Sequence, residues 1–75
     1  MAESKEVTRL RTIWHSMNKD NALELFKEAK ALIGKLGRSN NTDHDKTQGF
    51  GYMEGIGMMM GALDFKPPYT KENNP

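Results

Sequence analysis

Histidine and neighbouring carboxylates are the side chains of this 75-residue sequence best suited to acid–base or metal chemistry. The sequence holds two histidines, His15 and His44, and Asp43 and Asp45 flank the second one. Consecutive side chains rarely converge on one ion, and aspartate is also common at helix starts, so we assign no metal site here. Glu54 stands alone among glycines, whereas acid–base catalysis typically needs a second titratable group. We therefore predict no catalytic residue, no metal and no cofactor, and expect a protein that is not an enzyme.

Two arginines close to an indole ring suggest ligand binding instead. Arg9 and Arg11 precede Trp14, and guanidinium groups beside an aromatic ring can hold a phosphate and a stacked base. The alternative is that their aliphatic stems only cover the edges of an apolar stripe. Further along the chain, Glu54 can pair with a base or cap a polar ligand. The candidate ligand-binding residues are Arg9, Arg11, Trp14, Phe50, Tyr52 and Glu54.

The segment 48–55, Gln-Gly-Phe-Gly-Tyr-Met-Glu-Gly, resembles the ribonucleoprotein octapeptide of RNA-recognition domains, in which aromatic residues on a strand stack on bases. It departs from that motif at both ends, since the family has Lys or Arg first and an aromatic residue last. The family fold also needs a helix and a strand after the motif, and only residues 56–65 precede the tail. We therefore expect no RNA-recognition domain, but keep Phe50 and Tyr52 as stacking surfaces.

Apolar residues recur every three or four positions in the first half of the chain, a spacing typical of amphipathic helices. The polar residues 18–21 interrupt this pattern with side chains that favour caps and turns. We predict helices over about residues 4–17 and 21–36, with Ser4 as the first N-cap and Gly37 as the second C-cap. One continuous helix is the alternative, because the rhythm almost carries across the break. The first stripe is formed by Val7, Leu10, Trp14 and Met17.

A third helix is predicted over about residues 46–63, although five glycines interrupt it and each costs about 0.8–1 kcal/mol relative to alanine. Pairs of glycines four residues apart, as at 51 and 55 and at 57 and 61, let another backbone approach a helix closely. They lie roughly opposite an arc of methionine and other apolar residues, so this helix has two contact faces. A glycine-rich loop with a helix beginning near Tyr52 is the alternative. The interface candidates are Trp14, Gly51, Gly55, Gly57, Met58 and Gly61.

Together these segments predict an all-α fold of two or three amphipathic helices in one domain over residues 1–65. Residues 66–75 contain three prolines, which favours an extended or disordered tail. A chain of this length buries only about 60% of its unfolded surface, and the sequence has no cysteine for a disulfide. We therefore expect an open helical hairpin or bundle that homo-oligomerisation completes.

Charge and composition narrow the function classes. Eleven basic against ten acidic residues give a formal net charge of +1, which disfavours nucleic acid as a partner. No segment is apolar enough to span a membrane or to act as a signal peptide, so we expect a cytoplasmic protein without membrane contact. The leading hypothesis is a small interaction protein that binds and blocks a larger protein or nucleoprotein, by analogy with small phage-encoded modulators. The alternative is an oligomer that sequesters a nucleotide-like anion in pockets between subunits.

Overall fold

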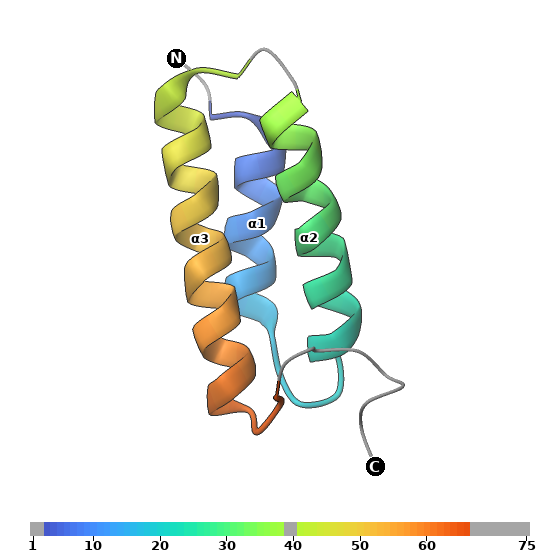
Figure 1. The fold of residues 1–75 in the computed structure, drawn as a ribbon. Coiled ribbons are helices and arrows are strands. Elements are labelled where there is room, and N and C mark those ends of the chain that lie inside the picture. Colours follow the sequence, from blue (N-terminus) through green and yellow to red (C-terminus); the bar gives the residue numbers. More distant parts are fainter. Residues whose placement is uncertain (1–2, 39–40, 67–75) are drawn as a thin grey trace.

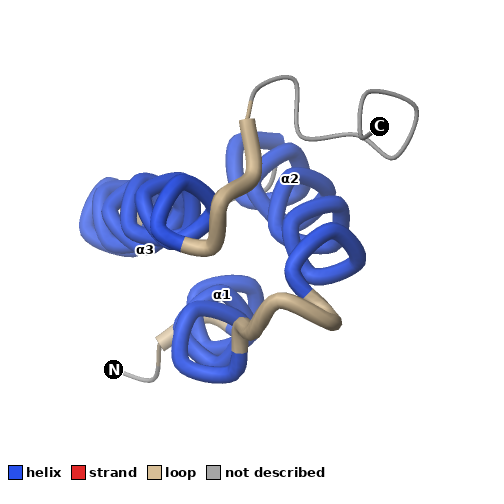
Figure 2. The backbone as a smooth tube through the Cα atoms, turned by 90° about the horizontal axis from the view of Figure 1, so that it is seen from below, coloured by secondary structure: helices blue, strands red, loops and turns tan. Residues whose placement is uncertain are grey.

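Three helices make up the regular structure of the residues that the computed structural model describes, 3–38 and 41–66. Helix α1 spans Lys5–Ser16, α2 spans Ala22–Arg38 and α3 spans Asp43–Ala62 (Figure 1). Each helix contacts both others, and the end-on view of Figure 2 places them at the corners of a triangle. The all-α prediction is confirmed, and the number of helices is three. Of the predicted tail, residues 67–75 lie outside the described residues.

Polar side chains fix the helix starts and the break between α1 and α2. The Ser4 hydroxyl accepts the Val7 N–H at 3.2 Å, which confirms the predicted N-cap. In the loop, Asn18 Oδ1 accepts the N–H groups of Asp20 and Asn21. The Asn21 side chain in turn accepts the Asn18 N–H at 2.7 Å and donates to the Ser16 carbonyl at 3.0 Å. These bonds close a tight loop, so residues 4–36 do not form one continuous helix.

The ends of α2 and α3 differ from the predicted ones. Helix α2 continues through Gly37 to Arg38, so the C-cap predicted at Gly37 is wrong. Helix α3 begins at Asp43, three residues earlier than predicted, because the Thr42 hydroxyl caps it by accepting the Asp45 N–H at 3.1 Å. It is helical from there through all its glycines, which excludes the loop alternative.

A Schellman turn ends α3. The Phe65 N–H donates to the Met60 carbonyl at 2.9 Å, and the Asp64 N–H donates to the Gly61 carbonyl at 3.0 Å. Asp64 adopts the left-handed conformation that this turn requires, with φ of 71°. The turn also brings Phe65 back onto the apolar core.

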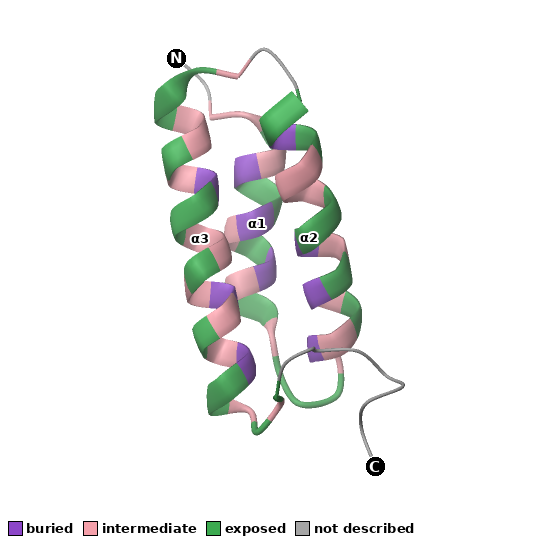
Figure 3. Cartoon of the chain, viewed as in Figure 1, coloured by how far each residue is buried: buried purple, intermediate pink, exposed green. Residues whose placement is uncertain are grey.

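The core lies between the three helices, where the buried positions of Figure 3 face inward. Trp14 is half-buried and packs against this core from α1. At one end of the bundle, Gly49 is buried against Leu36 and Leu10, and a Cβ at Gly49 would come well inside 3.0 Å of the Leu36 side chain. Glycine at this position therefore lets α3 approach the Leu36 side chain closely. The core residues are Leu10, Ile13, Ala22, Phe26, Ala29, Ile56 and Met60.

Candidate functional site

The outward face of α3 carries two exposed large hydrophobic side chains. Phe50 is 52% exposed and Met58 is 72% exposed, and no other large hydrophobic residue in the described part of the chain is exposed. Phe50, Glu54 and Met58 are spaced by four residues and so share one side of the helix. From Thr47 to Leu63, Glu54 is the only charged residue. We call this surface the α3 face; it comprises Phe50, Gly51, Glu54, Gly57, Met58 and Gly61.

The glycines predicted to form an interface divide into two groups. A Cβ at Gly51, Gly57 or Gly61 would meet no other part of the bundle within 4 Å, so these three open to the outside. At Gly55 the Trp14 ring would lie only 3.1–3.3 Å from such an atom. Gly55 is therefore covered within the chain, and of the two predicted pairs only Gly57 with Gly61 forms an open notch.

A shallow apolar pocket of about 260 Å³ adjoins the α3 face. Met58 and Trp14 line it, together with Gly55, Met59 and Ala62. The Trp14 ring is held in place by Tyr52, whose ring centroid lies 5.7 Å away. The pocket thus extends the exposed apolar surface from α3 toward α1.

Intramolecular carboxylates engage both arginines predicted to bind a ligand. Arg9 on α1 donates to both carboxylate oxygens of Glu28 on α2, at 2.5 and 2.8 Å. This hydrogen bonding lowers the pKa of Glu28 and raises the pKa of Arg9 relative to their ordinary values. Arg11 pairs with Glu3, with 2.9 and 3.0 Å between its Nη1 and the two oxygens.

The structure does not gather the predicted ligand-binding residues into one site. Arg9 is directed toward α2 by its ion pair, whereas Trp14 and Tyr52 lie together where α1 packs on α3. Phe50 and Glu54 are exposed on the α3 face. The arginines, the Trp14–Tyr52 pair and the two residues of the α3 face therefore lie in different places on the bundle.

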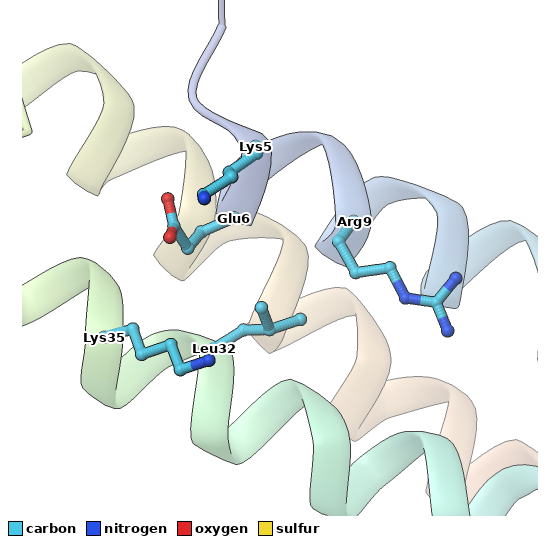
Figure 4. A pocket seen from close by; sticks show the side chains of 5 residues that line it. All are labelled: Lys5, Glu6, Arg9, Leu32 and Lys35. Carbon is cyan, nitrogen blue, oxygen red and sulfur yellow. The ribbon is translucent and has the colours of Figure 1, made fainter.

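A second depression, of about 280 Å³, lies between α1 and α2 (Figure 4). Lys5, Glu6 and Arg9 line it from α1, and Leu32 and Lys35 line it from α2. Figure 4 shows the Arg9 guanidinium pointing away from Lys5 and Glu6. Neither Lys5 nor Lys35 forms an ion pair within the described residues. Sequence reasoning missed this cleft, because the lysines lie thirty positions apart and only the helix packing brings them together.

The histidines have separate surroundings. His15 lies beside Trp14, with ring centroids 5.2 Å apart, and His44 is exposed in the first turn of α3. Within residues 3–38 and 41–66, no group of three or more histidine, aspartate or glutamate side chains is arranged to hold a metal ion. Over the same residues, no helix combines the length and hydropathy needed to cross a bilayer.

Comparison with protein-family models, curated proteins and solved structures yields no match for this chain. In the part of the chain that the structure describes, the candidate sites are the α3 face with its adjoining pocket and the cleft between α1 and α2.

Proposed function

We propose that this chain is a non-enzymatic interaction protein that binds a larger protein through the α3 face and blocks or redirects it. The single observation that carries this proposal is the exposure of Phe50 and Met58 on the same side of α3, beside the Trp14 pocket. Clustered exposed apolar side chains are typical of protein-binding surfaces.

The composition of the α3 face supports this role. Burial of the exposed parts of Phe50 and Met58 against a partner would contribute roughly 1–2 kcal/mol each. The methionine side chain is flexible and polarizable, which suits adaptable binding surfaces. The nearby pocket is lined by the half-buried Trp14, and large aromatic residues often dominate binding energy at interfaces.

The open glycines also support a contact surface. Gly57 and Gly61 lower the helix propensity of α3, yet neither is required for packing inside the bundle. Without side chains at these positions, a partner backbone can approach α3 closely. Their cost to the helix is thus offset only when the α3 face is covered.

A photo-crosslinking amino acid at position 58 tests the proposal in lysate of the source cells. We expect a discrete protein adduct from position 58 and none from the matched position Lys27, which is exposed on α2. Phe50→Ala in the same background should reduce the adduct several-fold, because it removes a neighbouring anchor of the surface. Equal labelling from positions 58 and 27 would contradict a role for the α3 face.

A second candidate function, sequestration of a small anion, is favoured by the cleft between α1 and α2. Lys5 and Lys35 supply two cationic groups beside the apolar Leu32 and outnumber the one carboxylate, of Glu6, that also lines the cleft. This arrangement suits a phosphate attached to an apolar or aromatic group. The site would then differ from the one predicted around Arg11 and Trp14. Isothermal titration with ATP and with inorganic phosphate tests this idea, and Lys35→Ala should abolish the binding heat. Absence of binding heat from both anions with the unmodified protein would refute it.

A further inference from the structure

We propose that a second copy of this chain binds the α3 face, so that two α3 helices pack antiparallel about a twofold axis at Glu54. This dimer shares its surface with the proposed function, so the second copy and the larger protein would compete for the α3 face. The positions of large and small residues on α3 and the charges at its two ends carry it.

Large and small residues alternate along two stripes of the α3 face. Residues seven apart lie nearly above one another on a helix, so Phe50 shares one stripe with Gly57, and Gly51 shares the other with Met58. On the first stripe the large residue lies toward the N-terminus, and on the second it lies toward the C-terminus. Each stripe therefore has one projecting side chain and one notch on opposite sides of Glu54.

A twofold axis through Glu54, perpendicular to the helices, fits each projection into a notch. Such an axis reverses the direction of the partner's α3 and places each stripe against the same stripe of the partner. Phe50 then lies over the partner's Gly57, and Met58 lies over the partner's Gly51. A twofold interface requires this self-complementarity, because one patch serves both copies. The open space at both glycines lets the two backbones approach.

Charge favours the antiparallel over the parallel direction. The first turn of α3 carries Asp43 and Asp45 next to Lys46, a net negative charge, whereas Asp64 and Lys66 balance each other after its last turn. Antiparallel packing brings each net negative turn toward the partner's balanced end, and it also opposes the two helix dipoles. Parallel packing instead places two acidic turns side by side, where they repel.

The same axis brings the two Glu54 carboxylates close together. Glu54 is exposed, and no lysine or arginine from Thr47 to Leu63 offsets its charge. Two like charges in contact weaken an interface, so Glu54→Gln should tighten the dimer roughly three- to tenfold at low to moderate ionic strength. Glu54→Lys alone keeps a repelling pair and should not tighten it. Mixed with the unmodified chain, however, that variant creates an opposite-charge pair.

Sedimentation equilibrium over about 10 μM to 1 mM covers the range in which a small interface associates. We expect reversible dimers of the unmodified chain and tighter dimers of Glu54→Gln. Native mass spectrometry of Glu54→Lys mixed with isotope-labelled unmodified chain should show mixed dimers in excess of random pairing. Monomers of both the unmodified chain and Glu54→Gln at every concentration would overturn the proposal, and so would random pairing in the mixture.

Cysteine pairs test the helix direction, since the chain has no native cysteine. Positions 47 and 61 are equidistant from Glu54, so antiparallel packing predicts a mixed disulfide between Thr47→Cys and Gly61→Cys chains. Ser16→Cys, exposed on α1, is the control and should form little disulfide. Preferential disulfides within the separate Thr47→Cys and Gly61→Cys samples would indicate parallel packing and overturn the proposal.

Met58→Lys distinguishes failure of the dimer from failure of the proposed function. This variant should lose dimerisation, whereas the matched Ala31→Lys on the exposed side of α2 should keep it. Dimerisation that survives Met58→Lys would overturn the dimer model. A monomeric chain whose position 58 still crosslinks to a larger protein contradicts only the dimer, and a dimer without that adduct contradicts only the proposed function.

Discussion

Helix α3 contains glycines of two kinds, and alanine should affect the stability of the protein differently at each. Gly49 is buried where α3 packs on the other helices, and a Cβ there would come well inside 3.0 Å of Leu36 Cδ2 and 3.6 Å from Leu10 Cδ1. Gly57 faces open space. Because Gly49→Ala and Gly57→Ala gain the same helix propensity, their difference isolates the packing at Gly49.

The change in unfolding free energy expected for each alanine variant follows from helix propensity and, at Gly49, from the clash with Leu36. Gly57→Ala should raise the free energy of unfolding by about 0.8–1 kcal/mol, the propensity difference between alanine and glycine. At Gly49 the same gain is opposed by Leu36, which is fully buried and cannot swing its methyl group into solvent. Carbon atoms normally lie about 3.5–4.0 Å apart, so Leu36 or α3 itself must move. Overpacking of this kind costs about 1–3 kcal/mol, which leaves Gly49→Ala between neutral and about 2 kcal/mol less stable than the unmodified chain.

Urea unfolding checks this prediction, followed by far-ultraviolet circular dichroism and by the fluorescence of Trp14. The measurement belongs at low protein concentration, where association through the α3 face does not contribute. Gly51→Ala, also in open space, is a second control and should behave like Gly57→Ala. Equal stabilisation by Gly49→Ala and Gly57→Ala would refute the close contact between Gly49 and Leu36.

Three further substitutions test the helix ends and the main ion pair. Asp64→Gly should stabilise the protein by about 1 kcal/mol in urea unfolding, because glycine adopts the observed φ of 71° without strain; an unchanged midpoint would speak against the Schellman turn. Asn21→Ala should destabilise it by about 1–2 kcal/mol through loss of two loop hydrogen bonds, whereas Lys19→Ala in the same loop should have little effect. Arg9→Met should cost under about 1 kcal/mol at neutral pH, since the pair with Glu28 is exposed. The pKa of Glu28 is lowered by folding, so its contribution is present above the ordinary value of 4.5 and is lost as the pH falls through the lower folded value. Between neutral and acidic pH, the unfolding temperature should therefore fall less for Arg9→Met than for the unmodified chain. Equal falls in both proteins would exclude the Arg9–Glu28 pair as a source of the acid sensitivity.

The helices could be predicted from the sequence because their apolar spacing and their N-caps are local features. The C-termini were harder to predict, as Gly37 illustrates. A glycine marks a helix end when it adopts positive φ, but Gly37 stays helical and the positive φ belongs to Asp64. Whether a chain turns at a glycine depends on where its next helix packs, and that information is not local.

The exposed residues of the α3 face could be predicted from the sequence, whereas the contacts between helices around it could not. Met58 is one of the interface residues that the sequence predicts, and the structure exposes it. The pairing of Arg9 with Glu28 joins residues nineteen positions apart on different helices, so no spacing rule indicates it. In the same way, the Trp14 ring covers Gly55 only because α1 packs against α3.

The glycine content of α3 couples the stability of this helix to the occupancy of its outer face. Five glycines cost roughly 4–5 kcal/mol of helix propensity, a large share of the 5–15 kcal/mol that typically stabilises a domain. Close packing accounts for Gly49 and Gly55. The other three glycines cost about 3 kcal/mol and have no packing partner among the described residues. A bound copy that covers Phe50 and Met58 supplies a gain of comparable size and stabilises the folded form by mass action. The urea midpoint of the unmodified chain should therefore rise with protein concentration, while that of Met58→Lys should stay constant. A midpoint independent of concentration in both would show that the cost of these glycines is not offset by self-association.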